Sequence, residues 1–249
     1  MKAHRIKRAL AGTLAAAMVI TSAAVTSPSA VYAAKSTVTV STQSQLDKAL
    51  KTVKKSNTTI YIKTGKKVTF TIKKGTYATA TLKINAAKAK IDNSAKFASI
   101  AVADASSVTE KATGNKIVNS DKSLTLTIDK KAKKTSVTTN KKAASLKLVV
   151  NGQLSTLKVQ AAQKVTLSGS TKNAPFVSVS KAGAGITSSI PVKLSLAANA
   201  SIVLKKGAEA SSIKVTKKEA VATVQNLTKK DIAVKDAEGK ETSVAAGTR

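Results

Sequence analysis

The chain lacks several residue types on which common functional sites depend. Among its 249 residues there is no cysteine or tryptophan, and its one histidine (His4) and two methionines (Met1 and Met18) lie near the start. Beyond residue 18 these absences exclude disulfides, Cys/His zinc sites, Ser-His-Asp triads and Cys-His pairs. Aromatic residues make up 2% of the chain. Proteins that stack nucleic-acid bases on aromatic rings need more of them.

Acidic residues are also scarce, because 12 acids stand against 43 basic residues and the net charge is +31. Arginine occurs only at positions 5, 8 and 249, so almost all of the positive charge is lysine. Lysine is a hydrated point charge, whereas arginine offers the planar fork that reads phosphates and guanine edges. The composition therefore favours diffuse attraction to a polyanion over sequence-specific recognition.

Residues 1–33 have the pattern of a secretory signal peptide. A basic segment, MKAHRIKR, precedes an alanine-rich apolar run, and Val31-Tyr32-Ala33 offers a cleavage site. The alternative, an uncleaved membrane anchor, would need about 20 apolar residues. Cleavage would remove four of the 43 basic residues and none of the 12 acids, so +31 would become +27. We predict a protein that is secreted, extracellular or non-covalently associated with the cell wall.

One amphipathic helix is predicted over about 43–54. Apolar residues recur there at i, i+3, i+4 and i+7 from Leu46 to Val53. Thr42, followed by Gln45 three positions later, fits a capping box at its start.

From residue 57 onward, short segments of alternating apolar and polar residues recur about every ten residues. Examples are SLTLTID (123–129), SLKLVVNG (145–152) and SSIKVTK (211–217). Such regular strands predict a sandwich, a barrel or a solenoid. The uniform spacing and the scarcity of aromatic residues favour the solenoid, because a sandwich core needs larger side chains.

The LDKALK helix, leading into TIYIKT (59–64) and then into strands with inward Ile, Val and Leu, resembles the secreted right-handed parallel β-helix proteins of the pectate-lyase-like superfold. The resemblance covers nearly all of the chain after the signal peptide and rests on a pattern, not on a motif. It implies an all-β fold with coils of two or three strands and roughly 20–30 residues. We expect an N-terminal strand and capping helix at 34–56, the β-helix at 57–226, and a cap or tail at 227–249. Within the last segment, 231–247 fits a β-hairpin.

Lysines gather in doublets between the predicted strands and alternate with apolar residues within them. If lysines of successive coils stack about 4.8 Å apart, each neighbouring pair repels by about 0.9 kcal/mol in water before screening. Solubility and protection of strand edges explain some of these lysines. Contact with an anionic polymer explains the excess better, because it would relieve the repulsion. The candidate polyanion-binding residues are Lys130, Lys131, Lys133, Lys134, Lys141, Lys142, Lys147, Lys205, Lys206, Lys217 and Lys218.

We expect a non-catalytic scaffold or adhesin-like protein whose charged flank, without a discrete pocket, contacts an anionic cell-wall polymer such as teichoic acid or an acidic glycan. Nucleic acid is expected only as a nonspecific partner, and end-to-end association of copies stays open. Two alternatives remain: a polysaccharide lyase-like enzyme, as the resemblance suggests, and a nonspecific DNA or membrane-surface binder. Lyases of this kind need acids that bind calcium and an Arg or Lys base, and beyond the signal peptide the only arginine is Arg249. We predict no catalytic residue, no metal and no cofactor.

Overall fold

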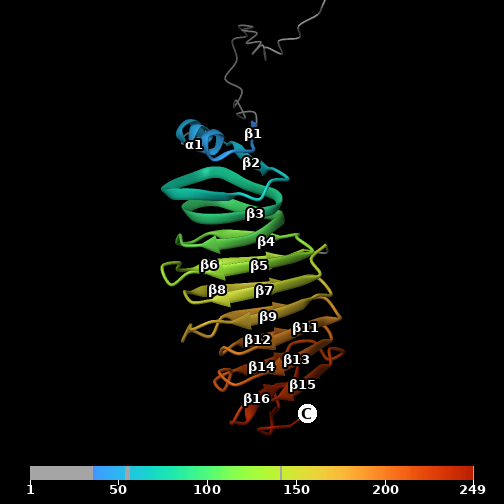
Figure 1. Ribbon diagram of the computed structural model, residues 1–249. Coiled ribbons are helices and arrows are strands. Elements are labelled where there is room, and N and C mark those ends of the chain that lie inside the picture. The colour runs from blue at the N-terminus through green and yellow to red at the C-terminus, as the bar shows by residue number, and fades with distance from the viewer. Residues whose placement is uncertain (1–35, 54–56, 141, 249) are drawn as a thin grey trace, which may run out of the picture. The chain divides into compact units, whose positions relative to one another are not determined.

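The computed structural model describes residues 36–53, 57–140 and 142–248, and the predicted signal peptide at 1–33 lies outside them. The described residues form a nearly all-β solenoid with one short helix (Figure 1). Its elements are β1 (Thr37–Val40), α1 (Gln43–Thr52), β2 (Thr59–Lys63), β3 (Thr69–Glu110), β4 (Lys116–Asn119), β5 (Ser123–Ile128), β6 (Thr135–Thr139), β7 (Ser145–Val150), β8 (Leu154–Val159), β9 (Lys164–Ser168), β10 (Phe176–Val179), β11 (Ala184–Ser188), β12 (Lys193–Leu196), β13 (Ala200–Leu204), β14 (Ser212–Val215), β15 (Ala222–Asn226), β16 (Ile232–Lys235) and β17 (Glu241–Val244).

From β5 to β14, strands pair in parallel with the strands two positions before and after them in the chain. Thus β8 pairs with β6 and β10, while β9 pairs with β7 and β11. This pattern gives two faces. We call the one with β2, β4, β6, β8, β10, β12, β14 and β16 the first face, and the one with β5, β7, β9, β11, β13 and β15 the second face.

About ten coils stack in this way, and they are short. Residues that lie over one another are 22 positions apart at Thr59 and Thr81 but only 16 apart at Ala184 and Ala200. The coils therefore lie at or below the lower end of the roughly 20–30 residues implied by the β-helix resemblance. Two strands joined by short turns account for this length.

Strand β3 is a 42-residue ribbon that winds around the solenoid, where separate short strands were expected (Figure 1). Its residues 81–85 pair with β2, residues 100–102 with β4 and residues 108–110 with β5. The ribbon thus contributes to both faces, because it stays extended through the bends between them.

Rows of aliphatic side chains fill the interior. Alternation along each strand points every second residue inward, and the parallel register places like residues over one another. Burial of each such side chain contributes about 1.5–3 kcal/mol relative to exposure. One buried row on the first face consists of Ile117, Val137, Leu157, Val177, Leu194 and Ile213.

Helix α1 covers the start of the solenoid, as the sequence predicted. The capping box of Thr42 and Gln45 is present, and Leu46 and Leu50 are buried. Gln43 also pairs with an unpaired part of β3: its Nε2 donates to the Thr71 carbonyl at 3.0 Å, and its Oε1 accepts from the Thr71 N–H at 2.9 Å. The side-chain amide therefore occupies backbone groups that could otherwise pair with another strand.

Strands β16 and β17 form the predicted antiparallel hairpin at the other end. An ion pair of 2.9 Å joins Lys235 to Glu241 across it. Strand β16 also pairs in parallel with β14, so coil stacking continues into the segment expected to be only a cap. None of the described residues belongs to a helix with the length and hydrophobicity needed to span a membrane.

Candidate functional site

Lysines on the strands do not stack in columns. In the registers between the labelled strands of the described residues, Lys214 opposite Lys235 is the one lysine–lysine pair. Elsewhere other residues lie opposite the lysines, as where Lys147 lies between Thr125 and Thr166. The expectation of stacked lysine columns is therefore wrong for the faces, and much of the expected repulsion is avoided.

The turns and bends carry most of the remaining lysines, along two edges of the solenoid. At one edge the chain passes from the second face to the first face, and we call this the basic edge. We call the other edge the opposite edge. The lysines on the basic edge are Lys73, Lys74, Lys96, Lys111, Lys130, Lys131, Lys133, Lys134, Lys172, Lys205, Lys206, Lys229 and Lys230.

The structure distributes the predicted lysines over three surfaces. On the basic edge, Lys130, Lys131, Lys133 and Lys134 lie in the β5–β6 turn, and Lys205 and Lys206 lie in the β13–β14 turn. On the opposite edge, Lys142 lies in the β6–β7 turn, and Lys217 and Lys218 lie in the β14–β15 turn. Lys147 lies in β7 on the second face, and Lys141 falls outside the described residues.

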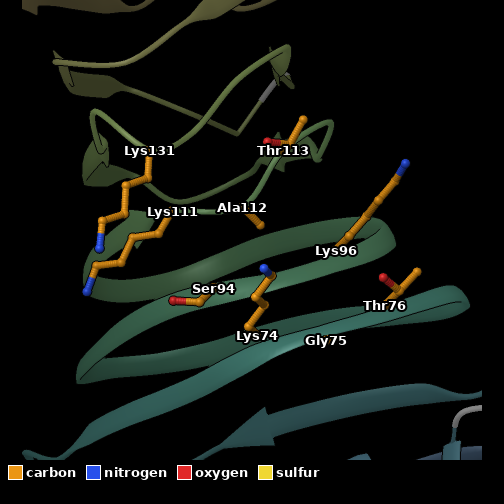
Figure 2. A pocket seen from close by; sticks show the side chains of 9 residues that line it. All are labelled: Lys74, Gly75, Thr76, Ser94, Lys96, Lys111, Ala112, Thr113 and Lys131. Carbon is orange, nitrogen blue, oxygen red and sulfur yellow. The ribbon is translucent and has the colours of Figure 1, made fainter.

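An open groove of about 720 Å³ lies on the basic edge. Figure 2 shows Lys111 and Lys131 extending in the same direction, whereas Lys96 extends toward the other end of the groove. The expectation of a flank without a pocket is thus wrong at this position. The lining residues are Lys74, Gly75, Thr76, Ser94, Lys96, Lys111, Ala112, Thr113 and Lys131.

A second groove of about 370 Å³ adjoins the first along the same edge. The β5–β6 turn separates them, since Lys131 lines the first while Lys130 and Lys133 line the second. The other lining residues of the second groove are Ala132, Asn151, Gly152, Gln153, Ser170, Thr171, Lys172 and Asn173.

Carboxylates are nearly absent around the two grooves. Among the described residues, the one carboxylate within 4.0 Å of the ammonium group of a groove lysine is that of Asp92, whose Oδ2 lies 4.0 Å from Lys111 Nζ. Asp129 also lies beside a groove lysine, and it accepts from the backbone N–H of Lys131. Both side chains are about one-third exposed, at 33% for Lys111 and 36% for Asp92. Such a long, partly exposed pair contributes little, so the grooves keep almost all of their positive charge.

The β5–β6 turn is held rigidly by the backbone beneath it. Asp129 Oδ1 accepts from the Lys131 N–H at 2.9 Å, and the Ala132 N–H donates to the Asp129 carbonyl at 2.8 Å. In the next coil, the Gln153 N–H donates to the Ala132 carbonyl at 2.9 Å. A β-carbon at Gly152 would lie 2.1 Å from the Asp129 carbonyl oxygen, so only glycine fits there. These contacts fix the turn and leave its lysines directed to solvent.

Glu110 supports the first groove from inside the solenoid. The side chain is fully buried, its Oε2 accepts from Asn93 Nδ2 at 2.9 Å, and its Oε1 accepts from the Ala112 N–H at 2.7 Å. Burial raises the pKa of Glu110 to about 7, although these hydrogen bonds oppose the rise. Because its neighbours Lys111 and Ala112 line the groove, Glu110 is a structural residue that positions the groove wall.

Sequence reasoning missed several groove lysines. Lys96, Lys111 and Lys172 are single lysines, whereas most of the predicted lysines came from doublets. Lys74 was also missed, although it belongs to the doublet Lys73-Lys74. They lie 15 or more positions apart in the chain, and only the coil register brings them to one edge. Knowledge of the coil length would have been needed to group them.

The described residues contain no cluster of three or more His, Cys, Asp or Glu that could hold a metal ion. No protein-family model matches the sequence, and no curated protein or solved structure is significantly similar to it. The strand pairing therefore establishes the parallel solenoid by itself, and the functional argument rests on the basic edge.

Proposed function

We propose that this protein is a non-catalytic secreted or cell-surface scaffold, adhesin-like in character, that contacts an anionic polymer through its basic edge. The polymer would be a cell-wall teichoic acid or an acidic glycan. One observation carries the proposal: seven lysines line two adjoining grooves, and among the described residues Asp92 is the one acid whose carboxylate lies within 4.0 Å of any of their ammonium groups.

The physical reason is the cost of concentrating like charges. Ammonium groups gathered along one edge repel one another, and nearby carboxylates would reduce this repulsion if solubility were the only requirement. A polyanion on the edge would replace that repulsion with attraction and would release its own counterions. Binding should therefore be strong at low salt and weaken steeply as salt is added.

Glu110, whose pKa is raised to about 7, is not placed to act as a catalytic residue. Glu110 is fully buried, and both of its oxygens accept hydrogen bonds within the protein. It is thus placed to hold the groove wall and has no contact with the groove itself. This observation supports a binding role over the lyase-like alternative.

We also propose that the coils wind in the right-handed sense expected from the β-helix resemblance. Connections between parallel strands of one sheet are right-handed in about 98% of cases. Kinship with the pectate-lyase-like superfold is likewise a proposal, supported by the parallel coils and the N-terminal helix.

A cosedimentation experiment tests the proposed function. Purified protein is mixed with insoluble bacterial cell walls, either native or stripped of teichoic acid, over a salt series, and the bound fraction is measured. We expect strong binding to native walls that is lost on stripping and falls steeply with salt. Absence of binding to native walls at low salt would refute attachment to this polymer.

A further inference from the structure

The two grooves lie on either side of the β5–β6 turn along the basic edge, and together they mark a path along the solenoid. We propose that this path holds a single extended chain of a phosphodiester-linked polyol, lying parallel to the solenoid axis with its phosphates over successive coils. This inference rests on the proposed function and specifies the ligand, its direction and its minimum length.

Four consecutive coils each contribute a lysine to the first groove: Lys74, Lys96, Lys111 and Lys131. Adjacent coils are about 4.8 Å apart, so the backbone positions that carry these lysines follow the axis at about that interval. The pairing of Glu110 with Ile128 confirms that Lys111 and Lys131 belong to neighbouring coils.

The path continues through the second groove. The next turn along the edge lacks a lysine but presents Asn151 and Gln153, and the turn after it presents Lys172. From Lys74 to Lys172 the edge therefore spans five coil intervals, or about 24 Å at 4.8 Å per coil. A linear polymer of about five or six anionic groups would cover this distance.

The lining of the grooves favours phosphates without rings between them. Hydroxyl donors from Thr76, Ser94 and Thr113 accompany the lysines of the first groove, and none of the described lining residues of either groove is aromatic. The nearby ring of Tyr77 is buried. Nucleic-acid bases stack on exposed aromatic rings, whereas a flexible polyol chain needs only charge and hydrogen bonds. Lysine is a suitable point charge for phosphate.

The opposite edge provides a contrast within the same molecule. Its turns at 103–107, 160–163 and 197–199 contain no lysine. At most two consecutive coils therefore present a lysine there. The opposite edge therefore also carries lysines, but it does not present them in four consecutive coils.

A length series with two matched variants tests the inference. Fluorescent glycerol-phosphate oligomers of two to twelve repeats are titrated with the protein, and binding is followed by anisotropy. In one variant Lys96, Lys111 and Lys131 of the basic edge are replaced by Gln; in the control Lys66, Lys88 and Lys142 of the opposite edge are replaced by Gln. Both lose three charges from outward-facing side chains. A third variant, with Lys74, Lys133 and Lys172 replaced by Gln, repeats the test with independent residues.

For the wild-type protein we expect affinity to rise steeply up to about five or six repeats and only slightly thereafter. Both basic-edge variants should lose at least about tenfold in affinity, and the opposite-edge variant less than about threefold. Equal losses in all three variants would overturn the inference and the assignment of binding to the basic edge, while contact with the anionic polymer, which the cosedimentation experiment tests, would stand. Oligogalacturonate that bound equally well, with the same sensitivity to the basic-edge changes, would overturn the assignment to phosphodiesters. Absence of wild-type binding to any oligomer or to native walls would overturn both proposals.

Discussion

At the scale of single residues, Glu110 shows how the core of a very basic protein can hold a carboxyl group. Its oxygens accept hydrogen bonds from Asn93 and Ala112, yet no lysine ammonium lies within 4.0 Å of it among the described residues. Desolvation then dominates, and the pKa of Glu110 rises from 4.5 to about 7. Folding therefore favours the protonated carboxyl between these two values.

The stability of the protein should consequently fall as the pH rises through this window. The folded state binds more protons than the unfolded state between pH 4.5 and about 7, so the Glu110 contribution is fully present below 4.5 and is lost by about 7. We expect the free energy of unfolding of the wild type, relative to Glu110→Gln, to decrease by roughly 3 kcal/mol over this range. Urea denaturation at pH 4.5, 6 and 7.5 measures the difference.

The exposed Glu219 supplies the control, because Glu219→Gln removes a carboxyl group from the surface. This variant should follow the wild-type pH profile. Parallel profiles for Glu110→Gln and the wild type would show that Glu110 titrates alike in both states and would contradict the account.

The local sequence predicted whether a strand residue faces the core or the solvent. It did not predict which polar side chains are buried by contacts with another coil. Lys147 is exposed between buried Leu146 and Leu148, as strict alternation requires. The burial of Glu110 was not predictable, since its partner Asn93 is 17 positions away in the preceding coil. A glutamate before a turn has the same local pattern whether it is buried or exposed.

At the scale of elements, the β5–β6 turn connects the fold to the candidate site. Its lysines contribute to both grooves, and the close approach of Gly152 from the next coil fixes its backbone. The position of these charges thus depends on a residue that carries no side chain.

Replacement of Gly152 by Ala should disturb both stability and the turn. The new β-carbon would lie 2.1 Å from the Asp129 carbonyl oxygen and 2.6 Å from that of Ala132, so the turn must shift. We expect a loss of roughly 1–3 kcal/mol in the free energy of unfolding, measured by urea denaturation. Gly65→Ala is the matched control, because no atom lies within 4 Å of its new β-carbon. Equal stability of the two variants would show that the turn is not constrained as described.

The sequence predicted the elements that depend on local signals. It did not predict the features that depend on how the coils stack. The helix expected at 43–54 is found at Gln43–Thr52 with its capping box, because both signals are local. The continuous β3 ribbon was missed, since lysines and alanines at its bends look like turns. The groove was missed for a related reason: Lys96, Lys111 and Lys131 meet only when their coils are stacked.

At the scale of the whole molecule, the distribution of charge matters more than its total. The net charge of +31 would attract any polyanion to any part of the surface. The faces place other residues between most of their lysines, and the opposite edge has turns that contain no lysine. Among the described residues, only the basic edge presents lysines in four consecutive coils, and these line a groove. Binding should therefore depend on which lysines are removed, and not only on how many.

The salt dependence of binding to soluble poly(glycerol phosphate) tests this claim most directly. The slope of log K against log salt reports the number of phosphate contacts, at about 0.7–0.9 per contact. Replacing Lys96, Lys111 and Lys131 by Gln should reduce the magnitude of the slope by about two to three, whereas replacing Lys66, Lys88 and Lys142 should leave it close to the wild-type value. The same reduction in both variants would contradict the account, because it would mean that net charge alone governs the interaction.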